Sequence, residues 1–285
     1  MATAVDRRFD VVWFGGPKAY PLHAEHFKRL LKKGQGGRGH FLVMPTTAHQ
    51  DEIEKTGNLL AFYYQQMNKT RKEDPPTFPV VKAPEMLQRI LDGHFHGPTG
   101  PFHTGWIFLN EISSKLWPTN PEYRKWVIAI AEGLQTRGLR PVVFSPFPSP
   151  PKNRADWKTL ADHAHIAVEN YVGGHAIVAQ GKNAPAFCEQ QYGATMTRYT
   201  GHGIAPERIF ITEHFGHTKL VGTVRRGRCS ITMNQWLNTI DTRTAALQKL
   251  GFGGFVSFAW MYNQMGAPLG DLLKATDRYL ARRLP

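Results

Sequence analysis

Short apolar runs alternate with longer amphipathic segments from one end of the sequence to the other. Continuous apolar runs are typical of strands buried on both faces of a parallel sheet, whereas apolar residues spaced three and four apart indicate helices. We predict strands at residues 9–14, 41–44, 79–82, 105–109, 141–144, 165–168, 208–212 and 254–259. We predict helices at residues 22–33, 50–69, 84–91, 121–137, 156–163, 184–200, 234–250 and 269–283.

This alternation predicts an α/β fold with a parallel sheet. The chain has 285 residues, and a single (β/α)8 barrel usually has about 250. No linker longer than a loop divides the chain, so we expect one (β/α)8 TIM barrel that spans residues 1–285. A doubly wound open sheet is the structural alternative, but no glycine-rich phosphate turn follows the first predicted strand.

The helix predicted at 121–137 carries start and stop signals. Asn120 is a favourable N-cap, Pro121 suits the first turn, and Gly138 suits the position just past the helix. We therefore expect this helix to have well-defined ends.

Polar residues stand directly after several predicted strands, at the carboxyl ends where (β/α)8 enzymes carry their catalytic groups. They are Asn110 and Glu111 after the fourth strand, Glu169 and Tyr171 after the sixth, Glu213 and His214 after the seventh, and Trp260 after the eighth. In a barrel, Glu111 and Glu213 would converge across the axis. Two carboxyl groups facing each other are what the cleavage of a glycosidic bond requires.

Two segments resemble motifs of the clan A (β/α)8 glycoside hydrolases. Residues 107–112 (IFLNEI) resemble the Asn-Glu motif of that clan, and residues 209–213 (IFITE) resemble its nucleophile strand. The resemblance implies a retaining enzyme in which Glu111 is the general acid/base and Glu213 is the nucleophile. Residues 44–47 (MPTT) depart from the clan pattern, because many members carry an arginine at the end of the second strand.

The same resemblance suggests further substrate contacts. Asn110 would bind the 2-hydroxyl of the sugar, Tyr171 would donate a hydrogen bond to Glu213, and Trp260 would form the floor of the sugar site. An aromatic ring also suits the apolar face of a pyranose. We expect the remaining contacts to come from His214, His49, Glu169 and Trp117, the last by stacking on a sugar.

Other interpretations of these residues are open. Glu111 could be a strand-end carboxylate paired with Lys115, and Glu213 could pair with Arg225 or Arg208. Glu169 could replace either glutamate as a catalytic group if the strand count is wrong by one unit. The 13 histidines include closely spaced pairs, but none has the spacing of a known metal motif. We expect no metal and no organic cofactor.

We predict an endo-acting glycoside hydrolase for a β-linked polysaccharide or oligosaccharide, of the β-glucan or β-mannan type. The alternative is a non-catalytic carbohydrate-binding or cell-surface protein on a degenerate barrel. A phosphate-binding aldolase or isomerase is disfavoured, because residues 222–227 (GTVRRG) are a poor match to a phosphate loop.

Composition adds little to this prediction. The net charge of +13 favours anionic partners, but the 35 basic residues form no long tract with interleaved aromatic residues, so we expect no nucleic acid partner. No apolar run reaches the length of a membrane span. Cys188 and Cys229 allow at most one disulfide, and two separate thiols are favoured. We expect a monomer, secreted with a leader that is absent from this sequence rather than cytoplasmic.

Overall fold

The computed structural model describes residues 11–12, 40–43, 59–64, 81–95, 105–147, 149–213 and 232–257. These residues contain eight strands in one sheet, in which neighbouring strands are parallel and follow the order of the chain. The strands are β1 (Val11–Val12), β2 (His40–Val43), β3 (Leu59–Tyr64), β4 (Trp106–Leu109), β5 (Arg140–Ser145), β6 (His165–Glu169), β7 (Ile209–Glu213) and β8 (Gly254–Ser257). The predicted parallel α/β fold is confirmed.

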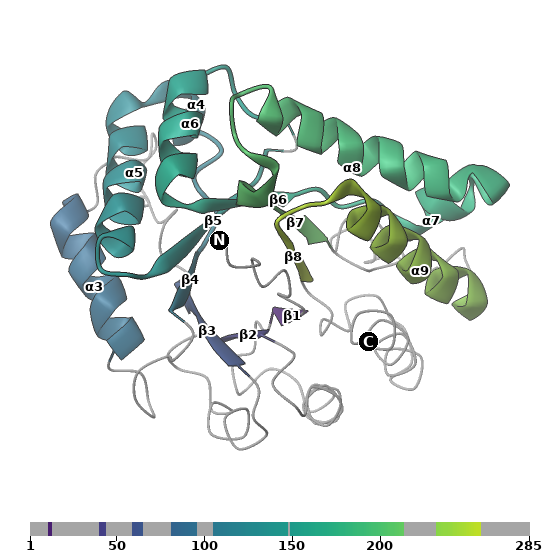
Figure 1. The fold of residues 1–285 in the computed structure, drawn as a ribbon, viewed down its shortest axis with the longest axis horizontal. Helices are drawn as coiled ribbons and strands as arrows, with labels where there is room; N and C mark the ends of the chain where they lie inside the picture. The colour runs from purple at the N-terminus through teal and green to yellow at the C-terminus, as the bar shows by residue number, and fades with distance from the viewer. Residues whose placement is uncertain are drawn as a thin grey trace, which may run out of the picture.

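The sheet curves, so that its first and last strands approach each other. β1 and β8 lie close together in Figure 1. No hydrogen-bonded ladder joins them within the described residues, where the strand order begins at β1 and finishes at β8. Closure into a (β/α)8 barrel therefore stays a prediction.

Helices connect the strands at most of the predicted places. The described helices are α3 (Ala83–Phe95), α4 (Leu116–Thr119), α5 (Pro121–Gln135), α6 (Arg154–His163), α7 (Gly174–Val178), α8 (Ala184–Thr200) and α9 (Met233–Leu250), with 3-10 turns η1 (Gly181–Asn183) and η2 (Pro206–Arg208). The predictions at 84–91, 121–137, 156–163, 184–200 and 234–250 are confirmed. The predicted helices at 22–33 and 269–283 lie outside the described residues.

The third strand was predicted in the wrong place. The sequence favoured a helix over residues 50–69 and a strand at 79–82, but the strand is Leu59–Tyr64. A short apolar run such as LLAFYY fits a buried strand or a buried helix, so periodicity alone could not separate the two. Val81 instead leads into α3, and its carbonyl oxygen accepts a hydrogen bond from Trp126 Nε1 of α5 at 3.0 Å.

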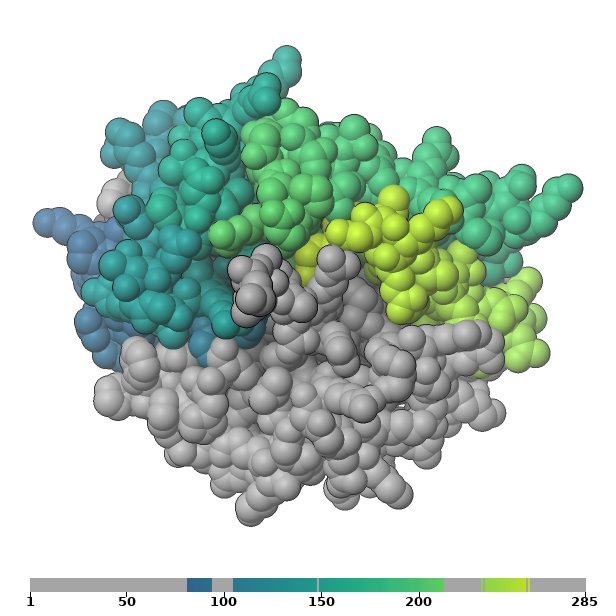
Figure 2. Space-filling view, viewed as in Figure 1, coloured from purple at the N-terminus to yellow at the C-terminus, as the bar shows by residue number. Residues whose placement is uncertain are grey.

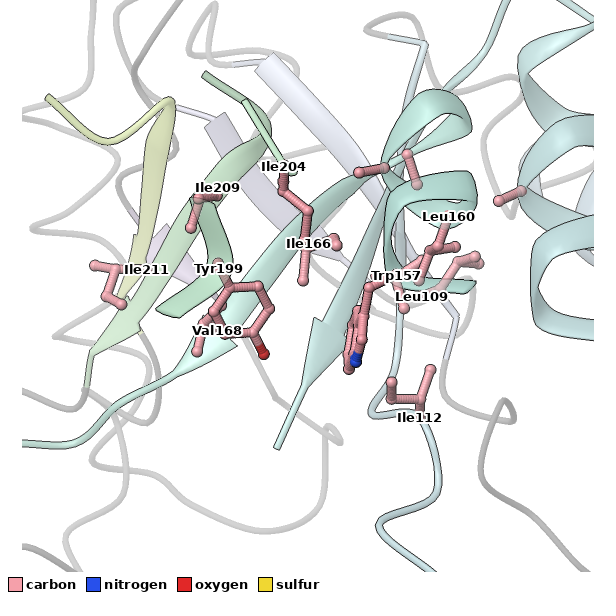
Figure 3. Close-up of a cluster of buried hydrophobic side chains, with 14 of the residues drawn as sticks. Leu109, Ile112, Trp157, Leu160, Ile166, Val168, Tyr199, Ile204, Ile209 and Ile211 are labelled. Atoms are coloured by element: carbon pink, nitrogen blue, oxygen red, sulfur yellow. The ribbon is translucent and has the colours of Figure 1, made fainter. Parts of the chain in front are cut away.

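Central strands bury both of their faces, which explains their continuously apolar sequence. Alternate residues of β4, β6 and β7 pack outward against the helices, including Leu109, Ile166, Val168, Ile209 and Ile211 (Figure 3). Residues on the opposite face of these strands and of β5 form a separate inner cluster of rings, in which neighbouring ring centroids lie 4.9–6.5 Å apart. The rings belong to Trp106, Phe108, Phe144, His165 and Phe210. Inner and outer positions therefore alternate along each strand.

Local signals set the ends of two helices. Asn120 Oδ1 accepts a hydrogen bond from the backbone N–H of Tyr123 at 3.1 Å, as the predicted N-cap of α5 should. Gly138 adopts a φ of 75°, which favours glycine after the helix. At α9, Thr232 and Gln235 exchange hydrogen bonds in a capping box.

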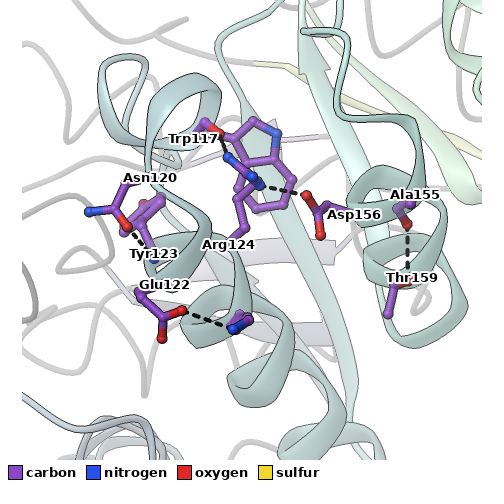
Figure 4. Close-up of polar contacts among 9 residues, drawn as sticks. Trp117, Asn120, Glu122, Tyr123, Arg124, Ala155, Asp156 and Thr159 are labelled. Carbon is purple, nitrogen blue, oxygen red and sulfur yellow. Dashed lines mark hydrogen bonds and ion pairs between the residues drawn. The ribbon is translucent and has the colours of Figure 1, made fainter.

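The outer helices pack in two groups, α3 and α6 against α5, and α7, α8 and α9 against one another. The residues from α3 to α9 cover one part of the molecular surface in Figure 2. Arg124 of α5 links three elements, because its guanidinium pairs with Asp156 of α6 at 2.5 Å and donates to the carbonyl oxygen of Trp117 at 2.9 Å (Figure 4). Beneath this contact, the rings of Trp117 and Trp157 lie 4.7 Å apart. These contacts fix the loop that follows β4.

Candidate active site

The segment after β4 carries Asn110 and Glu111, which are both half-buried. The next residue holds this segment in place, because the backbone N–H of Ile112 donates to the carbonyl oxygen of Phe144 on β5 at 3.0 Å and its side chain is buried. One residue later, the N–H of Ser113 donates to the Tyr123 hydroxyl at 2.8 Å. The backbone directly after Glu111 is therefore fixed by hydrogen bonds, which restricts the position of the Glu111 side chain.

The segment after β6 is held in a similar way. The backbone N–H of Asn170 donates to the carbonyl oxygen of Thr212 on β7 at 3.2 Å, and its side-chain amide donates to Thr195 Oγ1 on α8 at 2.8 Å. The carbonyl oxygen of Val172 accepts a hydrogen bond of 2.5 Å from Arg243, a buried arginine on α9. Tyr171 lies between these two anchors.

Glu111 and Glu169 form a carboxyl pair. Their side chains are hydrogen-bonded to each other although β5 separates their strands. In a flat sheet, strands two places apart are roughly 10 Å from each other. The contact therefore depends on the curvature of the sheet and on the length of both glutamate side chains.

The surroundings of this pair keep a proton on it. Burial is the largest of the causes that together raise the pKa of Glu169 to about 9, followed by the hydrogen bond to Glu111 and the negative charge of Glu111. A hydrogen bond from Tyr171 acts in the opposite direction, because a hydroxyl that donates to a carboxylate favours the charged form. The Glu169 carboxyl therefore keeps its proton to a higher pH than an exposed glutamate does, because its pKa is raised.

Thr212 lies beside this pair on the inner face of the sheet. It is the register partner of Glu169 on β7 and is fully buried. Its Oγ1 has no hydrogen-bond partner within the described part of the chain. A buried hydroxyl of this kind usually has a partner, so Thr212 marks a polar position at this edge of the sheet.

The predicted nucleophile is placed by its backbone. Glu213 is the last residue of β7, at the same carboxyl edge of the sheet as Glu111 and Glu169. Its side chain is outside the described residues, as are all atoms of His49, His214 and Trp260. The structure thus brings Asn110, Glu111, Glu169 and Tyr171 to one edge, and the roles of Glu213, His49, His214 and Trp260 stay predictions.

Tyr171 forms a hydrogen bond with Glu169. The hydrogen bond from Tyr171 to Glu213 that the resemblance to clan A implied involves a side chain outside the described residues, and it stays a prediction. The pairing of Glu111 with Lys115 is not seen, although both residues lie in the described part and Lys115 is exposed. Among the described residues, Glu111 interacts with the carboxyl group of Glu169.

Trp117 was predicted to stack on a sugar, and this prediction is wrong. Its side chain is 0% exposed, within the short helix α4, where it packs on Trp157. The sequence placed Trp117 in a loop, and loop tryptophans are often available to ligands. The apolar neighbour Leu116 was a sequence signal that Trp117 could be buried, and the structure buries both side chains.

Sequence reasoning also missed the residues that support the site. Arg243 and Thr195 hold the segment after β6, yet both lie far along the chain in helices. An arginine between Thr239 and Ala246, which are both buried, was the available hint for Arg243, because a charge on an apolar helix face needs a partner.

No group of three histidine, cysteine or acidic residues in the described ranges could hold a metal ion. The closely spaced His163 and His165 have different neighbours. His163 bonds Gln135 on the surface at 2.8 Å, and His165 lies among aromatic rings inside the sheet. The side chain of Cys188 is buried. None of the helices described here is long and apolar enough to cross a membrane.

Comparison with known proteins gives a likeness in fold alone. No protein-family model matches the sequence, and no curated protein sequence is significantly similar to it. Among solved structures, the tri-modular endo-β-1,4-glucanase B of Bacillus halodurans aligns with 98% of this chain at a TM-score of 0.54 and 11% identity. An endo-β-mannanase/endo-β-glucanase of Prevotella bryantii aligns with 97% at a TM-score of 0.53 and 8% identity.

The chain spans 59% and 49% of the length of these two proteins. A family 5 glycoside hydrolase of Prevotella bryantii is of similar length, with 97% of each chain covered, a TM-score of 0.50 and 9% identity. The fold of this protein is therefore similar to that of glycoside hydrolases, the class whose motifs its strand ends resemble.

Proposed function

We propose that this chain is a retaining glycoside hydrolase that cleaves β-linked polysaccharides or oligosaccharides. The observation that carries the proposal is the position of Glu111 and Glu213, which follow β4 and end β7 at one edge of a parallel sheet. The likeness in fold to endoglucanases and to a mannanase supports it. The proposal includes closure of the sheet into a (β/α)8 barrel and one catalytic domain over residues 1–285.

The mechanism follows from the two carboxyl groups. Glu111 protonates the leaving oxygen while Glu213 attacks the anomeric carbon, which gives a covalent glycosyl-enzyme. Glu111 then takes a proton from the water that hydrolyses this intermediate. Asn110 binds the 2-hydroxyl of the sugar, a contact that strengthens in the transition state.

The substrate class is part of the proposal. The similar proteins are named as an endo-β-1,4-glucanase and an endo-β-mannanase/endo-β-glucanase. We therefore propose endo action on a β-glucan or β-mannan, with Trp260 under the sugar and with His49 and His214 on its hydroxyls. The chemistry needs neither a metal nor an organic cofactor.

A substrate panel with matched variants tests the proposal. Wild-type protein should release reducing sugar from at least one β-glycan, and Glu111→Gln and Glu213→Gln should each lower kcat by about 10²–10⁴-fold. Glu122→Gln is the control, because Glu122 lies exposed on α5 and pairs with Lys125 at the surface. An activated 2-fluoro glycoside should label Glu213, and NMR should show a product with retained configuration.

The outcomes separate the hypotheses. Binding of a β-glycan without turnover by wild-type protein would reject the hydrolase and favour the carbohydrate-binding alternative. A product with inverted configuration would reject the double displacement. Full activity of Glu111→Gln on an unactivated glycan would reject the role of Glu111.

A further inference from the structure

Asn170, which follows β6, bonds its side chain to helix α8. Its amide nitrogen Nδ2 donates to Thr195 Oγ1 at 2.8 Å and to the carbonyl oxygen of Gln191 at 3.4 Å. Thr195 is 0% exposed, so the shorter of these hydrogen bonds ends on a buried acceptor. An amide nitrogen has two hydrogens to donate. Two acceptors on one helix therefore fix the orientation of the Asn170 amide.

The two acceptors are a hydroxyl and a carbonyl that stand one helical turn apart. A threonine within a helix often donates its own hydroxyl hydrogen to the carbonyl oxygen one turn before it. Thr244 of α9 does so, because its Oγ1 donates to the carbonyl oxygen of Ile240 at 2.9 Å. In α8, the corresponding oxygen atoms of Thr195 and Gln191 both accept from Asn170. The helix thus provides a paired acceptor for this amide.

The backbone of Asn170 is held by a different element. Its N–H donates to the carbonyl oxygen of Thr212 on β7 at 3.2 Å. Thr212 directly precedes Glu213, the last residue of β7. Asn170 therefore links α8 to the strand that carries the proposed nucleophile.

A second anchor follows two residues later. The carbonyl oxygen of Val172 accepts a hydrogen bond of 2.5 Å from Arg243, which is 0% exposed on α9. Removing a guanidinium group from water costs free energy. Tyr171 lies between these two anchored residues, and Glu169 directly precedes them. The segment that carries both side chains is therefore held by β7, α8 and α9.

We propose that Asn170 is a positioning residue that fixes Glu169 and Tyr171 at the carboxyl edge of the sheet. This inference rests on the proposed function, because it gives Asn170 a part in the same reaction through its two neighbours. Both neighbours are half-buried at the edge where Glu213 ends β7. A displacement of about 1 Å in an active site lowers a rate by as much as about 10²-fold, so the position of this segment affects turnover.

Thr195→Val tests the proposal without changing the site itself. Valine keeps the volume of the side chain, removes the acceptor hydroxyl and leaves Asn170 in place. On an unactivated β-glycan, kcat should fall about tenfold or more while KM changes by less than about threefold, because groups that act in the transition state are displaced. Thr195→Ser keeps the hydroxyl and should restore most of kcat. Kinetics are measured well below the lowest thermal midpoint of the variants, so that every protein is folded.

Thr244→Val is the matched control. It also removes a buried helical hydroxyl, but the hydrogen bond that it loses lies within α9. Its kcat should stay within about twofold of wild type. A loss of kcat in this control as large as that in Thr195→Val would overturn the proposal, because general weakening of the helices would then explain both.

A double-mutant cycle tests whether Asn170 acts through Thr195. Residues that act through one hydrogen bond show non-additive effects. The variant with both Asn170→Ala and Thr195→Val should therefore lose no more kcat than the more impaired single variant. Losses that multiply would show independent roles and would overturn the assignment.

Hydrogen exchange tests the anchor without turnover. The backbone N–H of Asn170 bonds to Thr212 and should exchange slowly in wild type. Its exchange, followed by NMR, should be about tenfold or more faster in Thr195→Val and unchanged in Thr244→Val. Equal exchange rates in wild type and Thr195→Val would overturn the anchor, even if the enzyme is active.

Failure of the proposed function gives a different result. If wild type hydrolyses no β-glycan while exchange is faster in Thr195→Val, the proposed function and the part of Asn170 in catalysis both fall, but the anchor stands. If wild type is active and both Thr195→Val and Asn170→Ala keep kcat within about twofold, the positioning role alone is overturned.

Discussion

His165 allows a quantitative test of the sheet interior. This first residue of β6 lies between Trp106 and Phe210, with ring centroids at 5.1 and 4.9 Å. The pKa of His165 is lowered to about 3, mainly by burial and in part by the nearby cations Arg208 and Arg140. A hydrogen bond to the Pro141 backbone acts against this, and since proline has no N–H, the ring must donate to its carbonyl oxygen.

The sign of the effect on stability follows from this pKa. The folded value is below the unfolded value of 6.5, so the unfolded chain takes up a proton first as the pH falls. The stability contributed by the neutral ring is complete above pH 6.5 and is lost as the pH falls towards 3. Linkage gives a loss of about 2 kcal/mol at pH 5 and about 3 kcal/mol at pH 4, relative to pH 8.

Urea denaturation of wild type, His165→Leu and His165→Phe at pH 8, 5 and 4 measures this effect. Both variants lack the titrating imidazole ring but pack differently. The difference between their free energies of unfolding should therefore be independent of pH. Wild type should lose about 2 kcal/mol relative to each of them between pH 8 and pH 5. Curves that stay parallel within about 0.5 kcal/mol would refute the buried neutral histidine. In wild type, the NMR shifts of the ring should remain those of a neutral imidazole at pH 5.

Packing around β8 and the anchor after β6 give further predictions. Gly254→Ala should lower the free energy of unfolding by about 1–3 kcal/mol, because its Cβ would lie 2.9 Å from Phe210 Cζ. Gly193→Ala is the matched control in α8, because the new Cβ would lie 3.5 Å from Leu250 Cδ2, an ordinary contact distance. This change should raise the free energy of unfolding by about 0.5–1 kcal/mol. If urea denaturation gives equal changes in the free energy of unfolding for the two variants, the close contact at Gly254 does not destabilise the fold. Arg243→Met should cost about 1–3 kcal/mol, because the Val172 carbonyl loses a donor from a charged group. An unchanged urea midpoint would show that this anchor is dispensable.

Local sequence was sufficient for most of the secondary structure. Helix α5 begins at Pro121 after the Asn120 cap, as the sequence predicted, because capping depends on neighbouring residues. Strands β4 to β8 lie at the predicted places, since a run buried on both faces is apolar at every position. The third strand failed because a short apolar run has no distinguishing period.

The polar residues at the strand ends could be identified from local sequence, because each follows an apolar run directly along the chain. Which of these residues are in contact depends on the three-dimensional packing of the strands. The contact between Glu111 and Glu169 passes across β5 and depends on the curvature of the whole sheet. The burial of Trp117 depends on Trp157, which lies in another helix. Such contacts join residues distant in sequence, and no local pattern of apolar and polar positions encodes the distance between them.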